Sequence, residues 1–344
     1  MNKLTMTEKK KLYIPRNFTR VIISLIILLG LCILASLAFG SRMIGWADLM
    51  DGLFHPSNQS LEANVVRQRI LRTIFSMMCG AALGVSGALM QSVTQNPIAD
   101  PSILGVNTGA SLFVVCGIAF FNISSANQYI WLAILGAFII AIFVFGIGSM
   151  GSGGATPLKL VLAGAATSAI LSSLVVAVML PRSNVMDQFR FWQVGSVGAG
   201  NWDSIKTFVP FLIIGILIAI FTGPALNALA LGDDVATGLG VRPNLLRGVA
   251  ICGGVILCGV TTALAGPIGF IGLLATHAIR LLIGSDLRFL IPLSGLAGAI
   301  ILTTSDVVGR LVGSPGELEV GIITAFIGAP ILILLAKKSK VRSL

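Results

Sequence analysis

The sequence predicts an all-α protein that crosses a membrane about ten times. The first observation is an apolar composition, with 56% hydrophobic residues and a mean hydropathy of +0.97. The second is that only 10% of the residues are charged, against about 25% in an average soluble domain. The third is that apolar stretches of roughly 20 residues recur along the 344 residues with short connections. We therefore expect one polytopic membrane domain without a soluble appendage.

The expected spans organise the chain into three parts. A basic N-terminal tail (1–20) precedes a transmembrane domain (21–336), and a basic C-terminal tail (337–344) follows it. The basic tail and the first span resemble a signal peptide, but the apolar run exceeds the roughly 7–15 residue core of such peptides and no small-residue cleavage site follows. We expect a retained helix. The ten spans are 21–40, 70–94, 102–121, 129–148, 158–180, 205–222, 246–265, 267–284, 289–308 and 320–336.

The distribution of positive charge predicts the orientation. An even number of spans places both termini on one side, and both termini are basic. With these spans, 15 of the 23 Lys and Arg residues fall on the side of the termini and 8 on the other. Cytoplasmic loops carry the excess of positive charge, so both termini are expected in the cytoplasm. The same distribution accounts for the net charge of +10 without nucleic-acid binding.

Glycines inside the spans predict close helix packing. In lipid, small residues let neighbouring helices approach, because van der Waals packing replaces the missing hydrophobic drive between helices. The chain has 40 glycines, and two groups stand within or beside expected spans: Gly80, Gly84 and Gly87, and Gly266, Gly269 and Gly272.

The chain lacks the sequence motifs of several kinds of functional site. It contains no G-x-x-x-x-G-K-[ST] phosphate loop and no Gly-Lys pair, so any ATP that drives it must be hydrolysed by another subunit. Two distant histidines, His55 and His277, make a metal site improbable. The odd set of five cysteines shows neither a disulfide framework nor zinc spacing. We expect no cofactor, no metal and no enzymatic activity. The cysteines are Cys32, Cys79, Cys116, Cys252 and Cys258.

Charged residues near span ends are open to two interpretations each. Asp306 either pairs with Arg310 at i, i+4 or serves a proton relay. His277 and Arg280 are either a hydrogen-bonded histidine with a snorkelling arginine or a contact with a partner subunit. The arginines on the expected external face are either solvated anchors or a cationic surface that holds the carboxylates of a partner. These arginines are Arg67, Arg69, Arg72 and Arg310.

Two connections have informative sequences. The run 96–101 contains two prolines and Asp100, so the chain must break there, and Asp100 can cap the next helix. The run 231–240, LGDDVATGLG, lies in the longest internal cytoplasmic stretch. It predicts a short surface helix closed by glycine.

Long motifs resemble one transporter family. The stretch 69–110 reads RILRTIFSMMCGAALGVSGALMQSVTQNPIADPSILGVNTGA, and it is followed by LVLAG from Leu160 and FWQVGS from Phe191. LNALALGDDVATGLGV from Leu226, AGPIGFIGLLATHAIRLL from Ala265 and the region 305–330 complete the series. In this order the motifs resemble the FecCD type of ABC-importer permease, which serves iron-siderophores, haem and cobalamin.

The resemblance implies a type II importer fold, with a permease dimer around a central pathway, two cytoplasmic ATPases and an external substrate-binding protein. Arg69, Arg72 and Arg310 match family positions that meet acidic residues of the binding protein. The segment 232–240 matches the coupling helix that sits in a groove of the ATPase. Its candidate residues are Gly232, Asp233, Asp234, Ala236, Gly238 and Gly240.

Three positions depart from the family pattern. Leu71, Thr276 and Glu319 stand where the family usually has proline. This change hints at a mixed dimer with a second, related permease.

The expected function is the translocation of a ferric siderophore across the cytoplasmic membrane, energised by separate ATPase subunits. A cobalamin or haem permease, an ion-coupled secondary transporter and a structural anchor are the alternatives. The chain does not disclose the ligand, because specificity lies largely in the binding protein. Polar residues of the second span and after it are candidates for the pathway, or else hydrogen-bond between helices. They are Ser86, Gln91, Asn96 and Thr108.

Overall fold

The computed structural model describes residues 17–42, 45–55, 60–121, 123, 126–151 and 155–340. Within these ranges the chain forms thirteen α-helices and one short 3-10 helix, without any strand. Most of the expected N-terminal tail lies outside the described residues. The helices are α1 (Phe18–Ala38), α2 (Trp46–Phe54), α3 (Leu61–Val93), η1 (Pro101–Leu104), α4 (Val106–Phe121), α5 (Ala126–Ser149), α6 (Pro157–Met179), α7 (Ser183–Gln193), α8 (Trp202–Leu229), α9 (Asp233–Gly238), α10 (Pro243–Ala265), α11 (Ile271–Ile283), α12 (Leu287–Val312) and α13 (Val320–Lys340).

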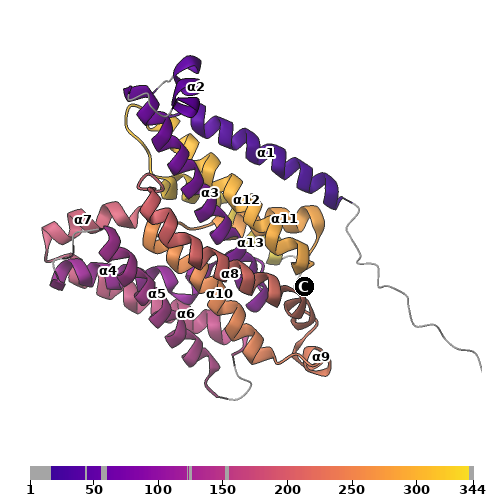
Figure 1. Ribbon diagram of the computed structural model, residues 1–344. Coiled ribbons are helices and arrows are strands. Elements are labelled where there is room, and N and C mark those ends of the chain that lie inside the picture. The colour runs from indigo at the N-terminus through magenta and orange to yellow at the C-terminus, as the bar shows by residue number, and fades with distance from the viewer. Residues whose placement is uncertain are drawn as a thin grey trace, which may run out of the picture.

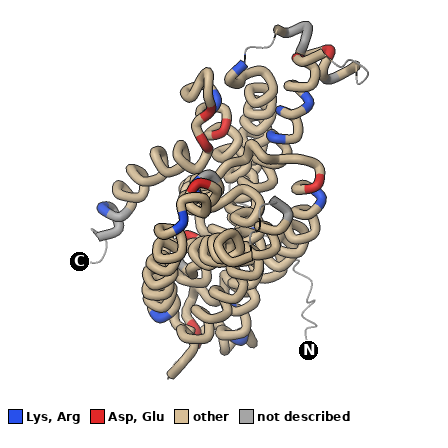
Figure 2. The backbone as a smooth tube through the Cα atoms, turned by 90° about the vertical axis from the view of Figure 1, so that its left-hand side faces the viewer, with Lys and Arg blue, Asp and Glu red and all other residues tan. Residues whose placement is uncertain are grey.

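The ten expected spans correspond to ten apolar helices, which confirms the predicted fold class. Seven of the described helices are long and apolar enough to cross a membrane, namely α1, α3, α5, α6, α8, α10 and α12. The other three, α4, α11 and α13, are shorter apolar helices. Charged residues are sparse along the backbone and stand mostly at or near helix ends (Figure 2). The helical middle of the protein is therefore suited to hydrocarbon.

Helix α3 is the centre of the bundle. It packs most extensively against α12 and also contacts α10 and α11. Helix α10 continues the packing to α8 and α5, and α4, α5 and α6 form a neighbouring group (Figure 1). Helix α1 lies along α12 at the periphery, and few of its side chains are buried. A buried α3 surrounded by lipid-facing helices follows from the glycine-rich sequence of α3.

The glycines of α3 bring backbones into direct contact. A Cβ on Gly80 would overlap the carbonyl group of Gly298 in α12, and one on Gly84 would overlap the carbonyl of Ser294. Gly87 meets Gly272 of α11 in the same way. The expected close packing is confirmed at these positions.

Gly84→Ala is expected to destabilise the protein by about 1–3 kcal/mol, because the added methyl group must push α12 away from α3. The measurement is the midpoint of thermal aggregation in detergent. Gly30→Ala in α1 is the matched control, since a Cβ there has no neighbour within 4 Å and alanine favours a helix. Equal midpoints for the two variants would contradict the packing argument.

Several helix ends differ from the expected spans. Helix α3 begins nine residues early because Ser60 caps it, with Oγ accepting a hydrogen bond from Ala63 N at 3.2 Å. Helix α11 begins at Ile271 instead of 267, because Gly266 and Phe270 both have positive φ angles, 75° and 69°. The expected C-terminal boundary at 336 is passed by α13, which continues to Lys340.

Four short elements stand between the spans, namely α2, η1, α7 and α9. Helices α2 and α7 were not expected from the sequence. The break at 96–101 was expected, and Asp100 caps η1, with Oδ1 accepting from Ser102 N at 3.0 Å. At one end of the bundle lies α2, and at the other lies α9 (Figure 1). We call them the α2 end and the α9 end.

Candidate functional site

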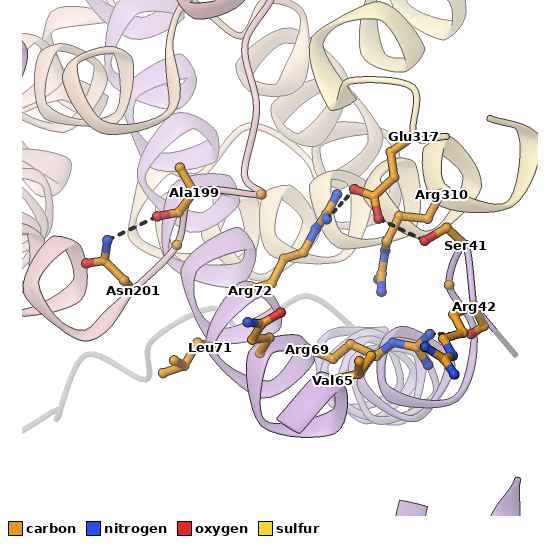
Figure 3. A pocket seen from close by; sticks show the side chains of 14 residues that line it. Ser41, Arg42, Val65, Arg69, Leu71, Arg72, Ala199, Asn201, Arg310 and Glu317 are labelled. Atoms are coloured by element: carbon orange, nitrogen blue, oxygen red, sulfur yellow. Dashed lines mark hydrogen bonds and ion pairs between the residues drawn. The ribbon is translucent and has the colours of Figure 1, made fainter. Parts of the chain in front are cut away.

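The α2 end carries a cluster of five charged side chains, which we call the arginine cluster. Figure 3 labels Arg69, Arg72, Arg310 and Glu317 of this cluster. Arg72 is at its centre. Its Nε donates to both carboxylate oxygens of Asp306 at 3.0 and 3.1 Å, and its Nη2 donates to Oδ1 at 2.7 Å. Its Nη1 donates to Glu317 Oε2 at 2.6 Å. The cluster consists of Arg69 and Arg72 of α3, Asp306 and Arg310 of α12, and Glu317 in the connection between α12 and α13.

Asp306 is buried between two arginines. Its side chain is 1% exposed, and its Oδ2 lies 3.1 Å from Arg310 Nη2. The predicted i, i+4 pair is confirmed, and Arg72 adds a second partner from another helix. Removing a carboxylate from water is costly, so a buried carboxylate needs such partners to stabilise its charge. The use of both oxygens by guanidinium groups favours the pairing interpretation over a proton relay.

Arg69 and Arg310 close the end of α1. Arg69 Nη1 donates to the carbonyls of Leu37 and Ala38 at 3.0 and 3.1 Å, and Arg310 Nη1 donates to those of Ser36 and Phe39, both at 3.1 Å. Helix α1 has no basic residue in its own last turn. Its orphan carbonyls are therefore satisfied by arginines from α3 and α12. Both side chains are buried, so the solvated-anchor interpretation is wrong for them, and their docking role stays a prediction.

Glu317 is the exposed member of the cluster. Its side chain is 38% exposed, and its Oε1 accepts a hydrogen bond from Ser41 Oγ at 3.2 Å. Burial alone would raise the pKa of the Glu317 carboxyl. The hydrogen bond and charge of Arg72, the hydrogen bond of Ser41 and the charge of Arg310 together outweigh burial, so the pKa lies below the ordinary 4.5 of glutamate. Glu317 is thus a carboxylate at neutral pH.

A polar cavity of about 580 Å³ opens beside the cluster. It is lined by Arg42, by members of the cluster, and by the turn at 198–201 before α8. Leu71, one of the replaced proline positions, also lines it. The cavity is a place where an external group can reach Arg72.

At the α9 end, the segment 231–240 forms the predicted surface helix. Gly232, with φ 107°, precedes α9, and Gly240, with φ 83°, follows it, so only glycine fits comfortably at both ends. Asp233 accepts two hydrogen bonds from Arg247 of α10, from Nη1 at 2.9 Å and from Nη2 at 2.7 Å. The Arg247 side chain is 2% exposed. This bidentate pair joins α9 to a helix in the interior of the bundle.

Exposed apolar side chains stand on and beside α9. Leu231, Val235 and Leu239 are exposed, as is Asp234, while Ala236 is fully buried against the bundle. Val235 lies within α9, whereas Leu231 precedes its N-cap and Leu239 is its C-cap. Together they give the α9 end an exposed apolar surface, which is suited to a groove on another protein.

The four pathway candidates make contacts within the subunit. Ser86 Oγ donates to the Gly254 carbonyl of α10 at 2.7 Å, and Asn96 Oδ1 accepts from Ile98 N at 3.1 Å. These contacts fit the interhelical and local hydrogen-bonding alternative, and a pathway role stays a prediction. Gln91 Oε1 accepts a hydrogen bond from Arg280 Nη2 at 2.8 Å, and Thr108 Oγ1 donates one to Ser168 Oγ at 3.2 Å.

Thr276, at one of the replaced proline positions, contacts helix α3. It is fully buried, and its Oγ1 donates to the Gly84 carbonyl at 3.4 Å. Helix α11 runs through this position without a break. The backbone carbonyl of Glu319 accepts a hydrogen bond from Ile322 N at 3.0 Å in the first turn of α13. Nothing in the structure explains the choice of glutamate there.

Among the described residues, no three His, Cys, Asp or Glu side chains gather in a way that could hold a metal ion. The five cysteines are free.

Two residues of these sites escaped the sequence reasoning. Arg247 stands just inside an apolar span, and an intramembrane charge is a signal in its own right. Glu317 gave no such signal, because it lies in a polar connection and meets Arg72 only through folding.

Comparison with known proteins places the chain in a family. The model of the FecCD transport family matches residues 27–338. The chain is 40% identical to the ferric enterobactin transport system permease protein FepD of Escherichia coli, over 91% of this chain and 94% of that protein. It is 37% identical to the siderophore transport system permease protein YfiZ of Bacillus subtilis, over 92% and 96%.

A solved structure of a metal-chelate type ABC transporter in an inward-facing conformation has a TM-score of 0.80 and 27% identity, covering 93% of this chain and 99% of that one. The sequence motifs, the ten apolar helices and these matches lead to one conclusion: the chain belongs to the FecCD transport family.

Proposed function

We propose that this protein is the permease subunit of an ABC importer that carries a ferric siderophore across the cytoplasmic membrane. The names of the two relatives, which refer to ferric enterobactin and to siderophore transport, support a siderophore over haem or cobalamin. Separate ATPase subunits supply the energy, since the sequence has no phosphate loop of its own. The α9 end then faces the cytoplasm together with both termini, and the α2 end faces outward.

The observation that carries the mechanism is the link between α9 and the bundle. An ATPase groove holds the exposed apolar side chains on and beside α9, namely Leu231, Val235 and Leu239. The Asp233–Arg247 pair passes the movement of α9 to α10, and α10 packs directly on α3. Two permeases moved in this way open the pathway between them alternately to each side. The partner permease is a second copy or a related chain, and the replaced prolines favour a related chain.

The arginine cluster is the proposed contact for the external binding protein. Arg69, Arg72 and Arg310 all line the cavity, and Arg69 and Arg310 also hold the end of α1 against α3 and α12. A carboxylate of the binding protein pairs with Arg72, and the two buried arginines add positive potential behind it.

The first test is transport in proteoliposomes. We expect accumulation of a ⁵⁵Fe-labelled siderophore only when the permeases, the ATPases, the binding protein and ATP are all present. Because the permease has no energy source of its own, vesicles without ATPase subunits should not accumulate substrate. Accumulation in those vesicles, or its loss on adding an uncoupler in the presence of ATP, would instead support an ion-coupled transporter.

The second test concerns docking. Arg72→Gln is expected to weaken the affinity of the purified binding protein for the transporter by about tenfold or more, because it removes a charged partner at the centre of the contact. The measurement is biolayer interferometry on nanodiscs. Arg242→Gln, an exposed arginine at the α9 end, should leave the affinity unchanged. Equal affinity for the wild type and Arg72→Gln would reject this face as the docking site.

A further inference from the structure

The two carboxylates that hold Arg72 differ in accessibility. Asp306 is 1% exposed and has a second arginine partner, so an external molecule cannot replace it without opening the bundle. Glu317 is partly exposed and binds Arg72 through the single nitrogen Nη1. Its other oxygen accepts a hydrogen bond from the hydroxyl of Ser41. Figure 3 shows Glu317 between Arg72 and Ser41 at the cavity.

When Glu317 leaves Arg72, the positive charge of the cluster is left with one carboxylate fewer to balance it. Arg69, Arg72 and Arg310 are balanced only in part by Asp306 and Glu317 (three positive charges against two negative). Without Glu317, the excess is two positive charges beside a cavity whose lining contains no other acidic residue. Electrostatic complementarity therefore selects an acidic side chain as the incoming group.

We propose that Glu317 is a placeholder carboxylate, which occupies Arg72 in the free permease and is displaced by an acidic side chain of the external binding protein when that protein docks. This inference rests on the proposed docking function and adds a competitor that lies within the same chain.

The geometry allows the exchange with little rearrangement. The backbone next to Glu317 is anchored, because Leu318 N donates to the Gly309 carbonyl at 3.1 Å. Glu317 therefore leaves by rotating its side chain toward solvent, while the connection stays in place. Asp306 continues to hold Nε and Nη2 of Arg72, so the guanidinium group stays aimed at the cavity. The binding protein meets an arginine that is already oriented.

The test is the affinity of the purified binding protein of the same importer for the assembled transporter in nanodiscs. Glu317→Gln keeps the shape of the side chain and removes its charge. We expect this variant to bind about two- to fivefold more tightly than the wild type, because an exposed ion pair competes only weakly. Raising the salt concentration should reduce the difference.

Two controls separate competition from a general change in charge. Asp187→Asn removes an exposed carboxylate of α7, which pairs with Arg190 at 3.4 Å outside the cavity lining, and it should bind as the wild type does. In a double-mutant cycle, Glu317→Gln should have no effect in the Arg72→Gln background, since the competitor then has no arginine to occupy.

The outcomes distinguish the inference from the docking proposal. If Arg72→Gln does not change the affinity, the docking proposal fails and the placeholder role fails with it. If Arg72→Gln weakens binding but Glu317→Gln leaves it unchanged or weakens it, the docking proposal stands and the placeholder role is rejected. Equal tightening by Asp187→Asn, or tightening by Glu317→Gln that persists in the Arg72→Gln background, also rejects it.

Discussion

Asp306→Asn is expected to lower the stability of the folded protein by about 3–5 kcal/mol, because it leaves two arginine side chains without their common carboxylate. Arg310 is 2% exposed and cannot regain water in place of this partner. An amide oxygen accepts hydrogen bonds but carries no charge, and the amide nitrogen would face guanidinium donors. The measurement is the midpoint of thermal unfolding in detergent, together with the yield of monodisperse protein.

The control is an ion pair of similar sequence spacing on the surface. Asp187 and Arg190 of α7 are 3.4 Å apart at i, i+3, and both are exposed. Asp187→Asn should cost less than about 1 kcal/mol, since solvent screens such pairs. If the two variants lower the midpoint equally, the cluster contributes no more than a surface pair does.

Asp233→Asn is expected to reduce ATP-driven transport by more than about tenfold while the protein still inserts and assembles. The change removes the charge that holds α9 to Arg247 of α10, and charge-assisted bidentate pairs are the stronger hydrogen bonds. With this link loosened, ATPase movement turns α9 without moving α10. The readout is the number of siderophores imported per ATP hydrolysed, which a purely structural defect in yield would not change.

Further variants define the role of the pair. Arg247→Met should resemble Asp233→Asn in coupling, because each removes one half of the same link. Asp233→Glu, which keeps the charge, should recover part of the transport. Asp203→Asn, an exposed aspartate in the first turn of α8, serves as the matched control and should transport normally. Normal coupling in Asp233→Asn would exclude this pair as the transmission point.

The spans were predictable because hydrophobicity is a local property of the chain. Ten apolar runs appear in the sequence, and each became a helix, since a chain in hydrocarbon must satisfy its backbone internally. The surface helix at 233–238 was also predictable, from glycines that set its two ends. Helix α7 was not, because its polar and aromatic residues have no transmembrane hydropathy.

The arginines show the limit of such reasoning. Sequence pattern places Arg69, Arg72 and Arg310 near the ends of two spans, and all three look alike there. Only the packing of α1 against α3 and α12 makes Arg69 and Arg310 buried caps of α1, while Arg72 pairs with two carboxylates. The same holds for Ser86. In the sequence it is a polar residue in a span, and only the structure shows that its hydroxyl donates a hydrogen bond to a backbone carbonyl of α10.

The sequence by itself determined that this chain is a ten-helix membrane protein, that α3 packs closely through its glycines, and that the motifs are those of one transporter family. These properties depend on residues close together in the chain. Tertiary structure alone decided which carboxylates hold Arg72 and which arginine holds Asp233. Arg72 and Glu317 are 245 residues apart, and no local pattern states that two side chains so distant in sequence share one hydrogen bond.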